Sequence, residues 1–340
     1  ESGINLNNVK RLSHILAKEI RDVIEPVTIR RNRLDIQNNP FYKDEVKDLS
    51  VVENPQEWFF ELSKEQSKFY DNIINEYFAL PDEGGLFKGS IYKPFEYEKE
   101  KLDELGEEEN FQFIQQFNLY DFMRRLLVKR FESSFGAFEQ SLKNFIRINK
   151  VVKEFIQKTD RYILDRSLLE KIYDKDSDEI EEYLNEYSER IRNNEYPKNH
   201  KVYELKNFKR EDDFRNDIES DIKLFENILN ELKELSLVAE DPKTACLIRE
   251  VKKVINTIPG KSEPKRKVLI FSEYADTIKY LSEIMLKEFN ERVLIVSGDL
   301  PVSKIKDINK NFDASINEQL DDYDILLTTD KISEGFNLNR

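Results

Sequence analysis

The stretch VLIFSE at Val268–Glu273 is short and continuously apolar, and it turns polar only at its end. Two similar runs follow it, RVLIVSG at Arg292–Gly298 and YDILLTTD at Tyr323–Asp330. Runs of this kind are typical of strands that are buried on both faces of a parallel sheet. The segments between them, around Ile278–Met285 and Ile305–Ile308, carry apolar residues at helical spacing. The order strand–helix–strand–helix–strand predicts a parallel sheet with right-handed crossovers.

Ligands bind sheets of this type at the carboxyl ends of the strands. The three predicted strands end in polar residues, namely Ser272, Glu273, Ser297, Gly298, Asp299, Thr328, Thr329 and Asp330. We therefore expect a binding site at that edge. The Ser297 hydroxyl and the Gly298 backbone amide suit a contact with a phosphate, and they suit a simple turn equally well.

Upstream of Pro242 the pattern is mostly helical. Apolar side chains recur at helical spacing in residues 9–25, in 111–158 as one or two long helices, and in 211–238. Residues 57–62 read as a strand, and Ser63 with Gln66 forms a capping-box pattern for the helix after it. A narrow apolar stripe predicts a core-facing helix surface, and it consists of Phe131, Phe135, Phe138, Leu142 and Phe145.

The charge is unevenly distributed along the chain. The net charge of −14 argues against a general nucleic-acid binder. Residues 81–110 carry ten acids and four lysines and could form a mobile excursion, whereas residues 121–160 carry nine basic and five acidic residues. If residues 125–150 form one helix, at about 100° per residue, one face is basic and is interrupted by Glu132. This face consists of Arg125, Lys129, Lys143, Arg147 and Lys150, and it is either a solvated surface or a track along a duplex backbone.

Composition excludes several classes of site and of protein. Cys246 is the single cysteine, so an internal disulfide framework is excluded and a reducing compartment is expected. His14 and His200 are far apart, without a Cys/His cluster, so we expect no metal site. No apolar run has transmembrane length, and no secretory signal is visible. We expect a soluble cytoplasmic protein that does not bind membranes.

Several segments carry a resemblance when they are taken in order. They are EPVTIRRNRLDI (25–36), FFELSKEQSKFYDNII (59–74), VKRFESSFGAFEQSL (128–142), DPKTACLIREV (241–251), KVLIFSEYADTIKYL (267–281), VLIVSGD (293–299), INKNFDAS (308–315) and DILLTTDKISEGFNL (324–338). Their order and spacing resemble superfamily II helicase-like ATPases, and the bacterial Swi/Snf branch fits best. Residues 267–281 resemble motif IV of the second RecA-like lobe, and residues 324–338 resemble motif V.

The resemblance implies roles for individual residues. Motif IV and V residues would contact nucleic-acid phosphates, and here these are Ser272, Ser297, Gly298, Thr328 and Thr329. In motif V, Glu334, Gly335 and Asn337 would face a nucleotide bound between two lobes, or they would form an ordinary surface loop. Arg30, Arg31 and Arg33 would lie near the hinge between the lobes, in contact with phosphates or with acidic lobe residues, or they would form a solvated end of an extended segment. In the first case Arg30 and Arg31 would belong to a basic track along the DNA. The intact protein would bind ATP and Mg²⁺ and would move along double-stranded DNA.

The sequence also departs from the family pattern. It contains no Gly-Lys-Ser/Thr phosphate loop, no Asp-Glu box after a buried strand, and no arginine-finger motif. We therefore expect no catalytic residue within this chain and no ATP hydrolysis by the chain alone. Lys331 and Asn339 replace the more usual apolar residue and Gln of motif V.

The fold expected is α/β plus α, with a mostly helical insertion followed by an incomplete parallel RecA-like lobe of the P-loop NTPase type. Residues 1–50 would be the end of the first lobe with an inter-lobe linker, 51–240 the helical insertion and 241–340 part of the second lobe. The insertion would contain the acidic excursion 81–110 and the basic helix 121–158. Two other functions stay open. One is a helical module that docks a protein partner through residues 80–240, and the other is a non-hydrolysing relative of such an ATPase.

Overall fold

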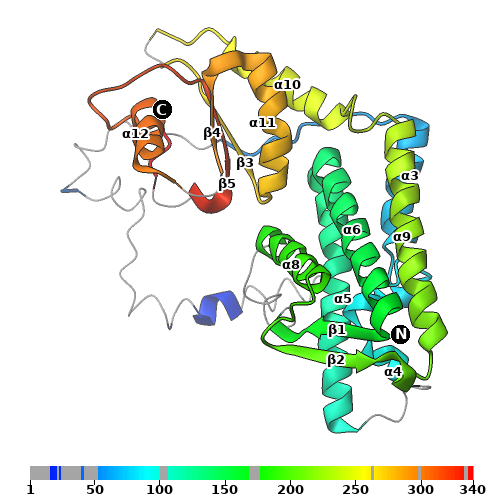
Figure 1. Cartoon of the computed structure of the whole chain (residues 1–340). Coiled ribbons are helices and arrows are strands. Elements are labelled where there is room, and N and C mark those ends of the chain that lie inside the picture. Colours follow the sequence, from blue (N-terminus) through cyan, green and yellow to red (C-terminus); the bar gives the residue numbers. More distant parts are fainter. Residues whose placement is uncertain are drawn as a thin grey trace. The chain divides into compact units, whose positions relative to one another are not determined.

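The computed structural model describes residues 16–20, 23, 40–41, 53–99, 106–167, 177–261, 264–297, 300–332 and 336–339 (Figure 1). The chain divides into two compact units, Glu1–Gln56 and Glu57–Arg340. In the first unit, residues 16–20 and 23 are helical, within the helix predicted for 9–25. The Arg-rich segment that contains Arg30 and Arg31 lies outside the described residues.

Residues 57–240 form a helical body in the second unit (Figure 1). Its α-helices are α3 (Lys64–Asn72), α4 (Phe95–Glu98), α5 (Glu107–Ser133), α6 (Phe135–Thr159), α8 (Ser177–Arg192) and α9 (Glu211–Glu234). Its two strands, β1 (Arg161–Asp165) and β2 (His200–Glu204), pair antiparallel. Helix α6 packs against α5, α8 and α9, because its apolar stripe is buried along its whole length. The prediction that the Phe131–Phe145 stripe is core is confirmed.

The two long helices α5 and α6 are separated by a single residue. Ser134 has an extended backbone, with φ −159° and ψ 131°, so the helical hydrogen bonds stop there. Its hydroxyl oxygen accepts a hydrogen bond from the Ala137 amide at 3.2 Å and so caps the start of α6. Residues 111–158 are therefore two helices, and no single helix spans 125–150.

The first helix of the body shows one correct and one wrong prediction. The capping box of α3 is confirmed, since the Ser63 hydroxyl accepts from the Gln66 amide while the Gln66 side chain accepts from the Ser63 amide. The strand predicted for 57–62 is wrong, because residues 53–63 have no regular structure. A strand needs a neighbouring strand to pair with, and none of the described strands pairs with this segment.

Residues 81–99 belong to the core of the helical body, contrary to the suggestion of a mobile acidic excursion. Their buried side chains are those of Phe87, Ile91, Tyr92, Phe95 and Tyr97. The fully buried Asp221 of α9 holds this segment, because its carboxylate accepts the backbone amides of Lys88 and Gly89 at 2.8 Å each. Burial raises the pKa of Asp221 to about 7, although both amide bonds favour the charged form.

Residues 241–339 form a region that we call the sheet region. Its strands are β3 (Val268–Ser272), β4 (Val293–Val296) and β5 (Ile325–Thr329), all parallel, in the order β3–β5–β4. Its helices are α10 (Pro242–Ile255), α11 (Ala275–Phe289) and α12 (Val302–Phe312). Helices α10 and α11 share a core with Ile325 and Leu327, whereas α12 shares a core with Leu326. Successive strand residues point to opposite faces, so β5 has helices on both sides, and the predicted small parallel sheet is confirmed.

The burial of the three strands is unequal. Every residue of β5 is buried, as expected for the middle strand. Strand β3 was predicted to be buried on both faces, and this is wrong, since its residues are half-buried and Phe271 is 39% exposed. Among the described residues, β3 pairs only with β5, so it is an edge strand.

Charged residues fix the amino-terminal edge of this sheet. Arg292 makes two hydrogen bonds to Asp324, with Nε–Oδ2 2.8 Å and Nη2–Oδ1 2.5 Å, and Lys265 adds a third contact at 2.7 Å. Burial alone would raise the pKa of Asp324, but these bonds outweigh it and lower that pKa. The cluster therefore ties the start of β5 to the start of β4.

Candidate functional site

The carboxyl edge of the sheet brings together two of the predicted phosphate-contacting residues. Ser272 ends β3 and Thr329 ends β5, and they are register partners on adjacent parallel strands. Ser297 follows the end of β4 and is exposed. Ser272 is half-buried, and its hydroxyl oxygen accepts the backbone amide of Tyr274 at 3.2 Å. Within the described part of the chain, no acceptor is recorded for the Ser272 hydroxyl proton, so this proton can be donated to a ligand.

The two threonines of β5 are less accessible than their position suggested. Thr328 is completely buried, on the strand face that points to α12, and its hydroxyl donates to the Thr329 carbonyl at 3.2 Å. Thr329 is 7% exposed. Their contacts with phosphate remain predictions, and Ser272 and Ser297 present the more open hydroxyls at this edge.

The segment after β5 is described in part. Gly298, Glu334 and Gly335 lie outside the described residues, so their predicted roles remain predictions. The Asn337 amide donates to the Asp313 carboxylate at 3.1 Å, and the Asn339 side chain accepts the Ala314 amide at 2.9 Å. These two bonds hold residues 337–339 against the loop that follows α12.

Asp313 is the acceptor at the centre of that loop. Its Oδ1 accepts the Ser315 amide at 2.8 Å and the Ser315 hydroxyl at 2.6 Å, in addition to Asn337. Burial alone would raise the pKa of Asp313, but these hydrogen bonds outweigh it and lower the pKa. Asn337 thus contributes to holding the chain here, whatever its relation to a nucleotide.

The five residues of the predicted basic face do not share one helix. Arg125 and Lys129 belong to α5, whereas Lys143, Arg147 and Lys150 belong to α6. Each approaches a carboxylate, in the pairs Arg125–Asp121 (2.9 Å), Lys129–Glu273 (3.9 Å), Lys143–Glu139 (2.9 Å), Arg147–Glu189 (2.9 Å) and Lys150–Glu226 (2.6 Å). The break at Ser134 therefore removes the geometry on which a continuous track was based, and contact with DNA remains a prediction.

A junction between the helical body and the sheet region adjoins β3, and the sequence did not reveal it. Tyr274 follows β3 by two residues, yet its side chain is 3% exposed and belongs to the core of the helical body. The guanidinium of Arg130, which is 0% exposed on α5, stacks over the Tyr274 ring at 4.4 Å from its centroid. The Arg130 Nη1 also lies 3.8 Å from Asp276.

The end of α5 and the start of α6 extend this junction. The Ser133 and Thr277 hydroxyls share a hydrogen bond of 3.0 Å. Gly136 lies flat against the Tyr280 ring, since a Cβ at that glycine would stand 2.2 Å from Tyr280 Cδ2. The Tyr280 hydroxyl donates at 3.2 Å to Asp241 or to the Val238 carbonyl. Side chains from both regions thus interlock.

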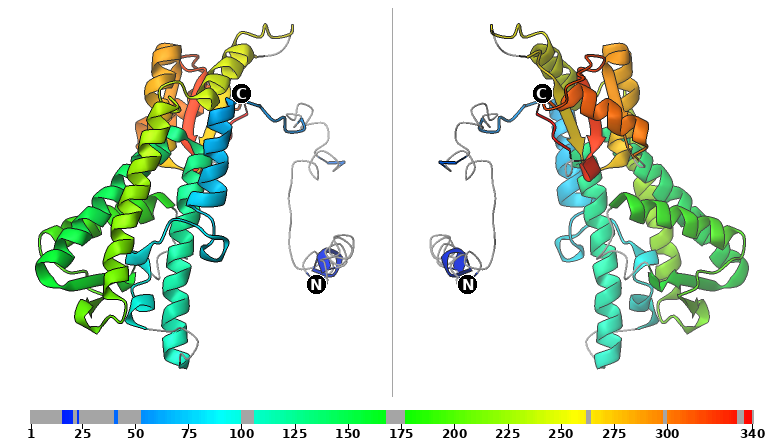
Figure 2. Two further views of the ribbon diagram at one scale, coloured as in Figure 1. Left: turned by 90° about the vertical axis from the view of Figure 1, so that its right-hand side faces the viewer. Right: turned by 90° about the vertical axis from the view of Figure 1, so that its left-hand side faces the viewer.

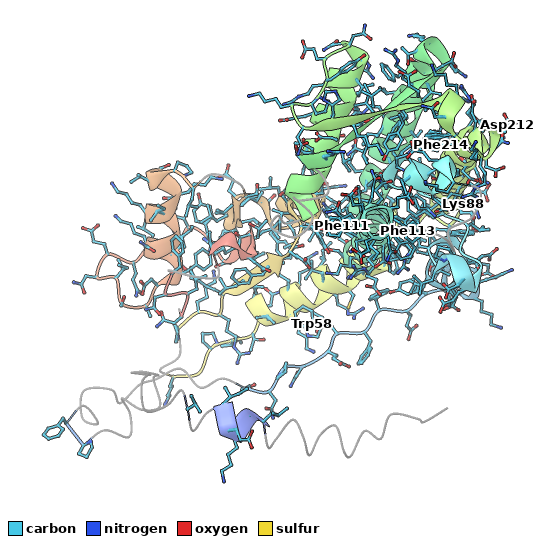
Figure 3. The ribbon with its side chains drawn as sticks, turned by 90° about the horizontal axis from the view of Figure 1, so that it is seen from below. Trp58, Lys88, Phe111, Phe113, Asp212 and Phe214 are labelled. Atoms are coloured by element: carbon cyan, nitrogen blue, oxygen red, sulfur yellow. The ribbon has the colours of Figure 1, made fainter. Side chains whose placement is uncertain are left out.

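A cavity of about 190 Å³ lies at the same junction. Trp58, the single tryptophan of the chain, contributes to its wall beside α10 (Figure 3). The other lining residues are Phe60, Ser133, Ser134, Asp241, Lys243, Thr244, Cys246, Leu247, Thr277 and Leu281. The buried Cys246 has the role of a core thiol, as predicted, and its Sγ lies 3.3 Å from the Phe59 carbonyl oxygen. Trp58 is therefore a natural reporter of the junction.

The described residues lack two further features. No group of three or more His, Cys, Asp or Glu side chains in that part of the chain could hold a metal ion. No helix among those described combines the length and the apolar content that crossing a bilayer requires.

Comparison with known proteins gives one finding. A search of curated proteins and a search of solved structures each returned no match. Residues 246–340 match the model of the helicase conserved C-terminal domain. This span contains the whole three-stranded sheet and its carboxyl edge. The match supports the assignment of residues 246–340 to a superfamily II helicase-like protein.

Proposed function

We propose that this chain is part of an ATP-dependent DNA translocase of the Swi/Snf type, from a bacterium, and that the carboxyl edge of its sheet contacts the duplex backbone. The observation that supports this proposal most directly is the placement of Ser272 and Ser297 at that edge, inside the helicase-matching span. Phosphate contacts position a protein on DNA without reading its sequence. Such contacts suit an enzyme that moves along DNA.

ATP and Mg²⁺ would be bound only in a protein that also supplies the missing elements. The sequence has no phosphate loop, and no group of ligating side chains in the described residues could hold a metal ion. The residues present therefore do not fit the nucleotide and its ion, and we derive no step through them. In this proposal the chain alone does not hydrolyse ATP.

Duplex binding by the chain tests the proposal. A labelled duplex is titrated with the wild type and with Ser272→Ala and Ser297→Ala, between about 50 and 200 mM salt. A hydrogen bond to a charged group contributes about 1.5–3 kcal/mol, so each variant is expected to bind at least roughly tenfold more weakly. The salt slope is expected to stay unchanged, because a serine releases no counterion. Wild-type affinity in both variants would contradict the proposal.

A second candidate function is supported by the charge of the helical body. Residues 57–240 contain 42 acidic and 29 basic residues, so they carry −13 of the net charge of −14. Helix α5 extends beyond its neighbours (Figure 2), and near its start Phe111 and Ile114 are 64% and 46% exposed. An acidic surface with exposed apolar side chains suits a basic protein partner and repels DNA.

Peptide binding separates the two candidates. The chain is titrated with basic and acidic peptides of equal length, each with two apolar residues. The docking function predicts preferential binding of the basic peptides and a severalfold loss in Phe111→Ser. Equal binding of both peptide classes, or no effect of Phe111→Ser, would contradict it.

A further inference from the structure

We infer that Arg130 and Tyr274 are positioning residues for the carboxyl-edge site, through which the helical body sets the orientation of the Ser272 hydroxyl. This inference rests on the proposed contact of Ser272 with a duplex phosphate. The inference gives a role to the junction between the helical body and the sheet region. The match to the helicase C-terminal domain does not include this role, since Arg130 lies outside residues 246–340.

The first step is the coupling of Tyr274 to Ser272. The Tyr274 amide donates to the Ser272 hydroxyl oxygen at 3.2 Å. This bond uses one of the two lone pairs of the hydroxyl oxygen, and it leaves the hydroxyl proton for an outside acceptor. A phosphate oxygen accepts hydrogen bonds and cannot donate them, so the Ser272 hydroxyl is held in the polarity that a phosphate requires.

The second step is the anchoring of Tyr274. Its side chain is buried in the helical core, although its backbone belongs to the loop after β3. The Arg130 guanidinium covers the ring at 4.4 Å, a distance within the range of a cation–π contact. The Tyr274 amide therefore cannot move without displacing a ring that is packed among residues of a different region.

The third step is the fixing of the first turn of α11, which directly follows Tyr274. Asp276 lies 3.8 Å from the Arg130 guanidinium, and Thr277 bonds to Ser133. Residues 274, 276 and 277 are thus all held by the last turn of α5. Because Arg130 and Ser133 lie one turn apart, a displacement of this helix end moves Tyr274 and the first turn of α11 together.

The charge at this helix end is balanced. Lys129 Nζ lies 3.9 Å from the carboxylate of Glu273, which directly follows Ser272 in the chain. This pairing partly neutralises that acid and so lowers the repulsion that a phosphate would meet there. Positioning and electrostatics therefore act from the same turn of α5.

The test uses the whole chain and the substitution Arg130→Lys, which keeps the charge and removes the planar stacking group. We expect Arg130→Lys to weaken duplex binding about as much as Ser272→Ala, roughly tenfold. The double variant should bind about as weakly as either single variant, because both changes act on one hydroxyl. Hydrogen exchange of the Tyr274 amide should become at least severalfold faster in Arg130→Lys.

A matched variant guards against loss of folding at this buried site. Thr277→Val removes only the hydrogen bond to Ser133 at the same junction, and it is expected to weaken duplex binding by a smaller factor and to leave the far-ultraviolet circular dichroism unchanged. If Ser272→Ala and Ser297→Ala both bind DNA normally, the proposed function fails. If Ser272→Ala binds normally and Ser297→Ala binds weakly, the positioning inference fails because Ser272 makes no contact. If Ser272→Ala binds weakly while Arg130→Lys and Thr277→Val both bind normally, the positioning inference alone fails. Additive losses in the double variant would also overturn it.

Discussion

The fit between Gly136 and Tyr280 allows a prediction whose sign is opposite to that expected from helix propensity. Gly136 lies in the first turn of α6, where exchanging Gly for Ala ordinarily stabilises a helix by about 1 kcal/mol. Here the new Cβ would stand 2.2 and 2.3 Å from two carbon atoms of the Tyr280 ring. Carbon atoms pack best at about 3.5–4.0 Å, so the ring or the helix must move by more than about 1 Å.

The cost of this movement can be estimated from its parts. Overpacking of this kind costs about 1–3 kcal/mol, and losing the hydrogen bond of the Tyr280 hydroxyl costs about 0.5–1.5 kcal/mol more. After the gain in helix propensity is subtracted, Gly136→Ala should lower the free energy of unfolding by about 0.5–3.5 kcal/mol.

Urea unfolding monitored by Trp58 fluorescence measures this change, because Trp58 adjoins the junction. The control is the double variant Gly136→Ala/Tyr280→Ala, in which the ring that blocks the new methyl group is absent. Its destabilisation should be smaller than the sum of the two single changes by at least about 1 kcal/mol. A higher urea midpoint for Gly136→Ala, or strictly additive changes, would refute the reasoning.

Three further predictions concern other parts of the second unit. The pKa of Asp221 is about 7 in the folded state and 3.8 in the unfolded state, so the folded state holds this proton more tightly. The stabilisation that results is complete below pH 3.8 and is lost as the pH rises from 3.8 through 7. The wild type should therefore lose up to about 1.4 kcal/mol per pH unit in that window, and Asp221→Asn should remove this slope in urea titrations at several pH values. Ser63→Ala should cost about 0.5–2 kcal/mol by loss of the α3 cap, measured as a thermal shift, whereas Ser63→Asp should cost far less. Arg292→Lys should lose the two-point contact with Asp324 and cost about 1–3 kcal/mol, and a neutral result in urea would contradict the assigned role of that pair.

The sequence predicted the elements whose signal is local. The three apolar runs predicted β3, β4 and β5, because short, continuously apolar runs are typical of strands in a parallel sheet, although β3 is only half-buried. The Ser63–Gln66 pair gave the start of α3, because capping depends on residues three positions apart. The phenylalanine stripe gave the buried face of α6 for the same reason.

The features that were missed depend on contacts between distant segments. No local pattern marks Ser134 as a break, since serine occurs within helices as well as at their starts. The position of β3 at the edge follows from strand order, which hydrophobicity does not encode. Residues 81–99 belong to a segment, 81–110, that is acidic as a whole, and only the packing against α5 and α9 shows that their aromatic side chains are core.

The sequence predicted one part of the candidate site and missed another. The location of Ser272 and Thr329 at one edge followed from the parallel sheet alone. Arg130 remained hidden because it looked like one more charge on a basic helix, and its burial arises only when the loop after β3 inserts its tyrosine.

The insertion of Tyr274 into the helical core also limits how the helical body and the sheet region can be separated or exchanged in evolution. The residues that match a helicase domain begin at 246, but the hydrophobic interior of the helical body includes a ring from position 274. Replacing residues 246–340 by the corresponding segment of another protein would leave a cavity in the helical core, unless that segment also had an aromatic residue at the position of Tyr274. The two regions are therefore expected to have changed together at this contact. A cut at the apparent domain boundary would remove one ring from the helical core, although the sheet region keeps its own two clusters of buried residues.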